Sequence, residues 1–330
     1  MKTSILSIVA ILMFNASFAK IWRVNNSAGI TVDFTTAQAA NDAASVLPGD
    51  TIHLEPSTTS YGSLGTNKRL VWLSIGAFLG SHTGEQYYSY GGRVDALNIN
   101  DGSANSVFSI VVGNSINVSA TNIGLIRCHV TGNIQLYNNS GTGPNNDIVL
   151  NCYCTGALLI YNGSNHNISN NIFGDYLYCG TGAGAFVVNN IFNSTTGSIN
   201  TVANCTIQNN IFSKVMTGYP FTNCVVEYNM AAGNVLPAGS NNQNNVTMSN
   251  VFVNDNGNTD ADFVLKAYTP QSLNPASGTG VGGVDLGAYG GTTPFKFALQ
   301  PAIPAIYKIV APAAPVGSTM NVQFSTKSNN

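Results

Sequence analysis

The chain has 330 residues, with 12 Lys and Arg against 14 Asp and Glu, so that charged residues make up only 8% of it and the formal net charge is −2. A chain with so little positive charge lacks the basic surface that nucleic-acid binding requires, which excludes nucleic acid as a partner. A hydrophobic content of 44% excludes a disordered chain. Asparagine contributes 44 residues, and it favours turns and stacked side-chain amide ladders.

The N-terminus, residues 1–19, has the pattern of a signal peptide. Lys2 supplies a positive charge, residues 5–14 form a short apolar run, and Ser17-Phe18-Ala19 places small residues where a signal peptidase reads. The apolar run is too short to span a bilayer, and no later run is long enough. We expect an exported protein that is secreted, periplasmic or at the cell surface, and that is not membrane-spanning.

Residues 20–50 are predicted to form a strand and one amphipathic helix that caps the coils after it. Apolar residues of the segment 34–45 fall on one side of such a helix: Phe34, Ala37, Ala40 and Ala44. Asp33 is the expected N-cap. The turn Pro48-Gly49-Asp50 then leads into an alternating strand that begins at Thr51.

Residues 51–291 contain a repeat with a period of about 20 residues. The sequence Asn-Asn-Ile-Phe occurs at 170–173, 189–192 and 209–212, each time after a short apolar strand. The same register gives a column of equivalent positions, expected to form a buried structural ladder: Cys128, Cys152, Asn171, Asn190, Asn210, Asn229 and Asn250. So short a period, without a helical pattern, predicts an all-β chain folded as a parallel β-helix, a solenoid in which each coil pairs with its neighbours.

Residues 292–330 form a proline-rich C-terminal tail. Its prolines disfavour a central strand or a helix until Met320: Pro294, Pro301, Pro304, Pro312 and Pro315. We expect an extended tail that lies along the rod or links it outward.

Taken together, these segments resemble the secreted right-handed parallel β-helix proteins of the pectate-lyase-like superfamily. The resemblance covers residues 30–291 and rests on four segments: the helix at 34–45, the turn and strand at 48–52, the Asn-Asn-Ile-Phe coils, and the closing segments 262–265 and 284–291. It implies a right-handed parallel β-helix. It does not imply one activity, because members of this superfamily include lyases, hydrolases and adhesins.

Candidate catalytic residues are scarce. Lyases on this fold use a Lys or Arg base with calcium held by carboxylates, and hydrolases use closely grouped carboxylates. Five charged residues lie between 102 and 254, and no two share a column: Arg127, Asp147, Asp175, Lys214 and Glu227. We therefore assign no catalytic residue and favour a non-catalytic surface or matrix rod. The alternative is a polysaccharide lyase or glycoside hydrolase, with Arg127 or Lys214 as a base or with carboxylates that loops bring together: Asp95, Asp101, Asp147 and Asp175.

An insertion at residues 81–95 interrupts the rhythm of the coils and carries the best candidate ligand site. Four of its residues offer aromatic rings and a guanidinium group that stack well on sugar rings: Tyr87, Tyr88, Tyr90 and Arg93. The expected partner is a polysaccharide or a cell-surface glycan. A cross-strand patch of tyrosines with no ligand is the alternative interpretation.

Residues 254–262 are rich in oxygen donors, so calcium is a candidate ligand although no cofactor is required. The donors alternate along the segment: Asn254, Asn256, Asn258, Asp260 and Asp262. The alternative is an ordinary turn before a strand.

The chain has six cysteines, and their register favours buried apolar fillers. Cys128 and Cys152 share one column, and Cys205 and Cys224 share another. A disulfide between stacked neighbours is the alternative that this spacing leaves open.

Overall fold

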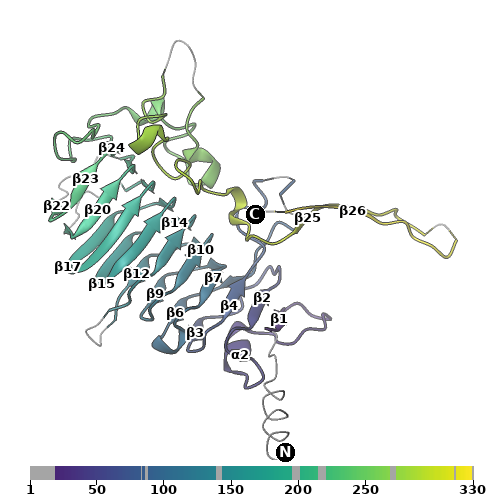
Figure 1. Cartoon of the computed structure of the whole chain (residues 1–330). Coiled ribbons are helices and arrows are strands. Elements are labelled where there is room, and N and C mark those ends of the chain that lie inside the picture. Colours follow the sequence, from purple (N-terminus) through teal and green to yellow (C-terminus); the bar gives the residue numbers. More distant parts are fainter. Residues whose placement is uncertain are drawn as a thin grey trace, which may run out of the picture.

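The structure, a computed structural model, describes residues 19–82, 84–85, 88–138, 143–194, 201–214, 221–267, 273–315 and 317–328. The predicted signal peptide therefore lies, apart from Ala19, outside the described residues, and so does Tyr87. The described chain is mostly β and forms a parallel β-solenoid of about nine turns, which confirms the predicted fold class (Figure 1). None of its helices is long and apolar enough to cross a membrane.

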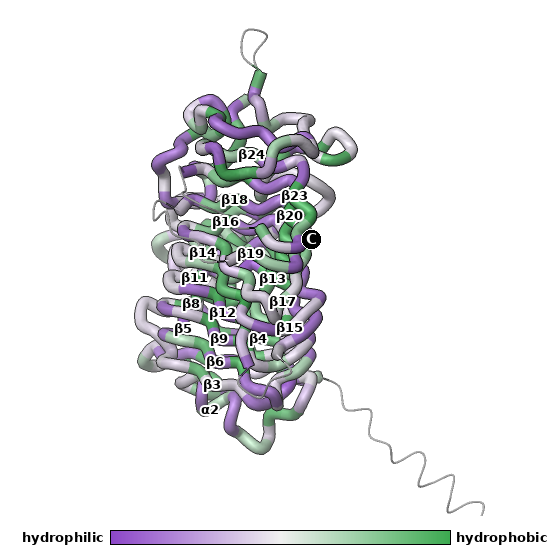
Figure 2. The backbone as a smooth tube through the Cα atoms, turned by 90° about the vertical axis from the view of Figure 1, so that its left-hand side faces the viewer, coloured by the Kyte–Doolittle hydropathy of each residue, from purple (hydrophilic) through white to green (hydrophobic). Residues whose placement is uncertain are grey.

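Each coil adds one short strand to each of three faces, which we call faces 1, 2 and 3 in chain order (Figure 2). Face 1 consists of β1 (Ile21–Val24), β2 (Thr51–Leu54), β4 (Val71–Leu73), β7 (Val107–Ser109), β10 (Gly124–Ile126), β13 (Ile148–Leu150), the second halves of β15 (Leu158–Ser169) and β17 (Leu177–Val188), β20 (Cys205–Gln208) and β23 (Val225–Glu227). Face 2 consists of β5 (Arg93–Val94), β8 (Val111–Val112), β11 (His129–Val130), β14 (Tyr153–Cys154), β16 (Ile172–Phe173), β18 (Ile191–Phe192), β21 (Ile211–Phe212) and β24 (Met230–Ala231). Face 3 consists of β3 (Leu64–Thr66), β6 (Leu97–Ile99), β9 (Ile116–Val118), β12 (Ile134–Leu136), the first halves of β15 and β17, β19 (Val202–Ala203) and β22 (Phe221–Thr222).

Side chains that point into the solenoid form continuous columns, because equivalent residues of successive coils pair in register. On face 2 the second residue of every strand is fully buried: Val94, Val112, Val130, Cys154, Phe173, Phe192, Phe212 and Ala231. Within this column the rings of Phe173 and Phe192 stack with their centroids 5.1 Å apart, and those of Phe192 and Phe212 do so at 5.3 Å. The core is thus a stack of like residues along the rod.

The corner between faces 1 and 2 explains the repeated Asn-Asn pair. The first residue of each pair has a left-handed backbone, with φ between 53° and 57°: Arg127, Asn151, Asn170, Asn189, Asn209 and Tyr228. Asparagine tolerates this conformation better than most residues, because its short polar side chain bonds locally. We call these six residues the corner column.

The second residue of each pair points inward and forms the ladder. The Oδ1 of Asn190 accepts from both the backbone N (3.0 Å) and the Nδ2 (2.9 Å) of Asn171. Asn190 in turn donates from both groups to the Oδ1 of Asn210, and Asn210 does so to Asn229. The Nδ2 of Asn190 also donates to the carbonyl of Ile168 in the coil before. Each amide therefore satisfies backbone groups that burial would otherwise leave unpaired.

The ladder differs from the prediction at its C-terminal end. Asn229 donates to the Oδ1 of Asn242, which takes the position that the spacing assigned to Asn250. Asn250 is instead exposed at the end of the 3-10 helix η2 (Met248–Asn250). The interval from Asn229 shortens to 13 residues because the chain pairs with β24 through Gln243 before it has completed a coil.

The N-terminal helix is shorter than predicted. Helix α2 spans Ala37–Asp42, and its N-cap is Thr36, whose side chain accepts from the N of Ala39 at 3.2 Å. Asp33 is not the cap, because its carboxylate accepts from the N of Arg23 instead. The side-chain amide of Gln38 donates to the carbonyl of Gly65 and accepts from the N of Gly65. It therefore pairs with the edge of β3, where a further strand would otherwise bond.

Residues 281–300, which we call the strap, lie along the outside of the corner between faces 1 and 2. The Nδ2 of Asn170 donates to the carbonyls of Ala288 (2.9 Å) and Gly290 (2.7 Å). Asn189 donates to the carbonyl of Asp285, Asn151 to that of Thr293 and Arg127 to that of Gln300. The strap therefore runs back along the corner column, against the direction in which the coils advance.

The C-terminal tail also differs from the prediction. After the 3-10 helix η5 (Phe297–Leu299), strands β25 (Ala305–Val310) and β26 (Gln323–Lys327) form an antiparallel hairpin that projects from the solenoid (Figure 1). Strand β25 forms between Pro304 and Pro312, which flank it without interrupting it. Both strands of a two-stranded hairpin are edge strands, where proline is tolerated.

We expect Asn190→Ala to lower the free energy of unfolding by about 3 kcal/mol, because it leaves the buried donors of Asn171 and the carbonyl of Ile168 without partners. Urea denaturation measures this loss. The control is Asn117→Ala, which removes an exposed amide that bonds to Asn98. Equal unfolding free energies for the two variants would contradict the role of the ladder.

We expect Asn170→Gly to loosen the strap without disturbing the coil, because glycine keeps the left-handed backbone and removes only the side-chain bonds to three strap residues, Ala288, Gly290 and Thr293. Limited digestion with chymotrypsin should cut at Tyr289 and Phe295 at least several-fold faster than in the unaltered protein. Asn165→Gly is the matched control, because Asn165 is also left-handed but lies at the corner between faces 3 and 1. The same cutting rate in both variants would show that the amide does not hold the strap.

Candidate functional site

The outward residues of face 2 divide this face into a covered and an open part. The first residue of each face-2 strand points outward, and from the fourth of these strands, β14, onward these residues are buried: Tyr153, Ile172, Ile191, Ile211 and Met230. They pack against strap residues that include Leu286, Ala288 and Leu299. The preceding three outward residues are Arg93, Val111 and His129, which the strap does not cover; Arg93 is exposed, and the other two are half-buried.

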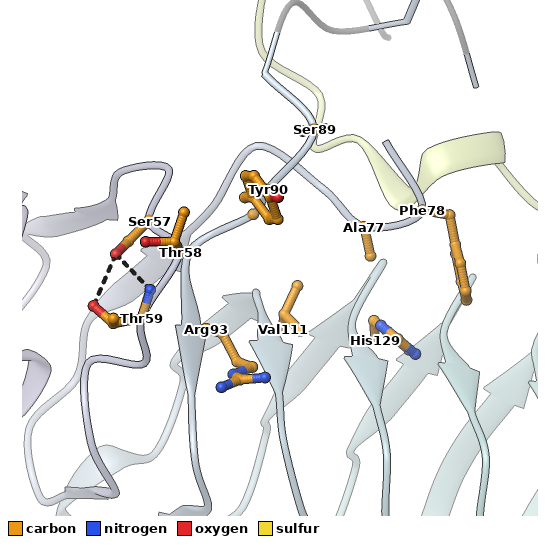
Figure 3. A pocket seen from close by; sticks show the side chains of 11 residues that line it. Ser57, Thr58, Thr59, Ala77, Phe78, Ser89, Tyr90, Arg93, Val111 and His129 are labelled. Atoms are coloured by element: carbon orange, nitrogen blue, oxygen red, sulfur yellow. Dashed lines mark hydrogen bonds between the residues drawn. The ribbon is translucent and has the colours of Figure 1, made fainter. Parts of the chain in front are cut away.

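This open part of face 2 is the floor of a pocket of about 190 Å³ (Figure 3). Arg93, Val111 and His129 project from neighbouring strands of this floor. One side of the pocket is formed by Ser57, Thr58 and Thr59. The other side is formed by Ala77 and Phe78, which precede the insertion, and by Ser89, Tyr90 and Gly91 within it. A second pocket of about 240 Å³ adjoins it and shares Ser57, Thr58 and Tyr90. Tyr88 lines this second pocket, together with Asn25, Ser27, Ile30 and Pro56.

Three of the four predicted ligand residues therefore meet at one place. Tyr90 and Arg93 line the first pocket, and Tyr88 and Tyr90 line the second. Tyr88 and Tyr90 are more than half exposed, at 57% and 56% of each residue. The fourth predicted residue, Tyr87, lies outside the described residues.

Among its described lining residues, the first pocket has one cationic group and no acidic one. Arg93 is exposed and forms no ion pair with the described part of the chain. Neither pocket is lined by an Asp or Glu among the described residues. A guanidinium group offers its N–H donors in a planar fork, so Arg93 is able to bind hydroxyl or carboxylate oxygens of a ligand.

His129 adds a neutral ring to the floor. Its ring lies 4.6 Å from that of Phe78 and 5.7 Å from that of Tyr153, measured between centroids. Burial among these rings lowers the pKa of His129 to about 4, although the charge of Asp260 acts in the opposite direction. The ring is therefore uncharged at neutral pH and contributes an apolar surface with one hydrogen-bond donor and one acceptor.

The insertion is fastened to the end of the strap. The Nε2 of His82 lies 2.7 Å from the Oδ1 of Asp260, whose Oδ2 accepts from the N of Ala298. The Nε2 of Gln300 donates to the carbonyl of Glu85 in the insertion, and just before the insertion the N of Ala77 donates to the carbonyl of Ala298. The wall of the pocket is thus held by residues more than 170 positions away in the chain.

Sequence reasoning missed Ser57, Thr58, Thr59, Phe78 and His129 as pocket residues. Ser57, Arg93, Val111 and His129 lie in different coils, and only the stacking of these coils brings them together. The sequence did contain a signal for the boundary of the open part. Along face 2, the outward residues change from Arg93, Val111 and His129 to the apolar residues that the strap covers. A change of this kind along one column marks where a solenoid face stops being open.

The predicted calcium segment is arranged around other contacts. Asp262 accepts from the N and Oγ1 of Thr259, from the N of Asn258 and from the Nδ2 of Asn254. Partial burial acts to raise the pKa of Asp262, but these hydrogen bonds hold it below its usual value. Asp260 points away from them into the interior, toward His82 and Ala298.

Asn256 in the same segment accepts from an ammonium group. The Nζ of Lys214 donates to the Oδ1 of Asn256 and to the carbonyl of Asp255, both at 2.7 Å. Across the described parts of the chain, no three His, Cys, Asp or Glu side chains are grouped as a metal site would require.

The carboxylates of the enzyme alternative do not come together. Asp95 and Asp175 follow the face-2 strands β5 and β16, which are four coils and about 19 Å apart. Asp101 is exposed and accepts from Asn138, whereas Asp147 is buried and lies 3.2 Å from the Nδ1 of His166. Grouped catalytic carboxylates lie within about 10 Å of each other around a groove.

The two candidate bases are engaged elsewhere. Arg127 bonds to the strap carbonyl of Gln300, and Lys214 bonds to Asp255 and Asn256. Neither residue lines the pockets described above.

Comparison of the chain with models of known protein families, with curated proteins and with solved structures finds no match.

We expect His129 to titrate near pH 4, and Phe78→Ala to raise its pKa toward 6.5, because the variant admits water to the ring. NMR titration of the imidazole measures both values. Phe297→Ala is the control, since Phe297 contacts His82 instead.

The lowered pKa means that the neutral ring stabilises the fold fully above about pH 6.5, and that this contribution is lost as the pH falls toward 4. A wild-type pKa near 6.5 would contradict the burial of this ring.

Proposed function

We propose that the protein is an exported, non-catalytic rod that binds glycan chains at the open part of face 2. The observation that supports this proposal most strongly is the convergence of exposed tyrosines, a guanidinium group that forms no ion pair with the described residues, and several hydroxyl groups around two adjoining pockets. The pectate-lyase-like superfamily, which the sequence resembles, contains secreted proteins of this kind, and the N-terminal pattern of residues 1–19 supports export.

The chemistry of the lining suits a carbohydrate. A sugar ring presents C–H groups on its faces, which pack on aromatic rings, and hydroxyl groups at its edge, which exchange hydrogen bonds with polar side chains. Tyr88 and Tyr90 supply the rings, whereas Ser57, Thr58 and Ser89 supply hydroxyl groups at the rim. The two pockets together fall within the range of about 300–1,000 Å³ that small-ligand sites occupy.

The shared residues set the direction in which a chain would lie. Tyr90, Ser57 and Thr58 line both pockets, so a ligand of two or more sugar units would cross Tyr90 and contact Arg93 on one side and Tyr88 on the other. We therefore expect oligosaccharides to bind more tightly than the corresponding monosaccharides.

A panel of neutral and acidic oligosaccharides, screened on an array and then by calorimetry, tests this proposal. We expect Tyr90→Ala and Arg93→Ala to weaken binding of the best ligand by tenfold or more, which corresponds to about 1.4 kcal/mol. Tyr137→Ala is the matched control, because Tyr137 is an exposed tyrosine that lines neither pocket. We also expect no release of new reducing ends.

Two results would contradict the proposal. One is the absence of binding to every member of the panel by a protein shown to be folded. The other is equal loss of affinity in the Tyr90 and Tyr137 variants, because that would place the ligand elsewhere on the solenoid.

A further inference from the structure

Three of the six cysteines form a cluster at the corner between faces 3 and 1, away from the proposed glycan site. Cys179 lies in β17, Cys205 begins β20, and Cys224 directly precedes β23. The Sγ atoms of Cys179 and Cys205 are 2.9 Å apart, and the N of Cys205 donates to the Sγ of Cys224 at 3.4 Å. The register of the repeats pairs Cys205 with Cys224 only, so sequence reasoning missed the contact with Cys179.

We propose that Cys179 and Cys205 are joined by a disulfide in the mature protein, and that Cys224 is the thiol through which this bond forms and exchanges. The two buried sulfur atoms need to approach by only roughly 0.9 Å to reach the S–S bond length of about 2.05 Å. Both side chains lie inside the solenoid, with 0% and 3% of Cys179 and Cys205 exposed. Once formed, the bond is therefore sheltered from external thiols.

Cys224 differs from its two partners in access and in reactivity. It is half-buried, whereas the other two are buried. Its interaction with the side chain of Cys205 outweighs the effect of burial and lowers the pKa of Cys224 below its usual value, and the N of Cys205, which donates to the Sγ of Cys224, acts in the same direction. The pKa of Cys205 is raised, mainly by its contact with the side chain of Cys179 and next by that with the side chain of Cys224. The thiolate is the attacking form in exchange reactions, so an external disulfide reacts first with Cys224.

The oxidant that we propose is a small-molecule disulfide such as oxidised glutathione. The Cys224 thiolate attacks one of its sulfur atoms, which breaks the S–S bond, releases one thiolate and leaves a mixed disulfide on Cys224. Cys205 gives its proton to the released thiolate and attacks the Sγ of Cys224, which releases the second thiolate. Cys179 then attacks the Sγ of Cys205 and releases Cys224 as a thiolate, and its proton goes to the second released thiolate.

The sum of these steps is balanced. Cys179 and Cys205 lose two electrons and two protons, the small-molecule disulfide gains them as two thiols, and Cys224 is regenerated. Cys224 therefore acts as a relay that carries oxidising equivalents from solvent to the buried pair.

The bond would tie the face-3 part of β17 to β20 on face 1. It closes a loop of 26 residues, which restricts the unfolded chain. We expect reduction of the oxidised protein to lower its Tm by about 5 °C.

Mass spectrometry of the intact mature chain tests the proposal. The folded, reduced protein is treated with oxidised glutathione, quenched by acid and digested with pepsin, because no Lys or Arg separates residues 128 and 213 for trypsin. We expect a peptide cross-linked through Cys179 and Cys205, with Cys224 free to react with an alkylating agent. Three free thiols in the folded protein after this treatment, or a final bond between Cys205 and Cys224, would overturn the proposal.

Two variants separate the relay from the bond. Cys224→Ser should slow formation of the bond between Cys179 and Cys205 by at least tenfold and leave the product unchanged. Cys179→Ser should stop the sequence at a bond between Cys205 and Cys224. Cys154→Ser is the control, because its thiol already donates to the carbonyl of Gly132 and a hydroxyl group keeps that acceptor. An unchanged rate in Cys224→Ser would refute the relay.

Discussion

The structure depends on one constraint, the turn that every coil makes between faces 1 and 2. At this corner the backbone must enter the left-handed region at one residue and bury the next one, where its backbone groups have no water to bond to. Asn189 and Asn190 show how the sequence meets both needs. Asn189 adopts the left-handed conformation with φ of 57°, and the side chain of Asn190 bonds to the coils before and after it. Cys152 accepts a hydrogen bond from Cys128 in the same manner, through sulfur.

The same corner determines which part of the surface stays open. The corner column directs its side chains outward, where Asn151, Asn170 and Asn189 bind carbonyl groups of the strap. The strap in turn covers Ile172, Ile191 and Ile211, whose burial contributes about 25 cal/mol for each Å² of apolar surface removed from water. The part of face 2 that the strap covers ends near Arg127, and the pocket begins at the next outward residue, His129. The position of the proposed glycan site therefore follows from the length of the strap.

The sequence predicted those features that recur in every coil. Asn171, Asn190 and Asn210 share a register that any stack of parallel coils must preserve, so their common column could be derived without coordinates. The prediction was wrong at Asn250, because the last coil is incomplete, and at Asp33, because Thr36 caps the helix. Both features occur once in the chain, and a repeat pattern carries no information about them.

The candidate site was predictable only in part, for a related reason. Tyr88, Tyr90 and Arg93 stand out because they interrupt the repeat, but Ser57 and His129 belong to separate coils and meet only through stacking. The contact between Cys179 and Cys205 likewise joins two faces that the register does not align. Contacts along a column follow from the period, whereas contacts across a corner depend on the path of each turn.

Hydrogen exchange in the unaltered chain tests most directly the claim that the corner column holds the strap and so defines the open part of face 2. The amide of Gly287 donates to the carbonyl of Asn209 in the solenoid, and the amide of Asn190 donates within the ladder. We expect the amide of Gly287 to exchange nearly as slowly as that of Asn190, and the amides of Thr58 and Tyr90 at the pocket rim to exchange far faster. If the amide of Gly287 exchanges as fast as these rim amides, the strap does not form a stable cover and this account of the open face is wrong.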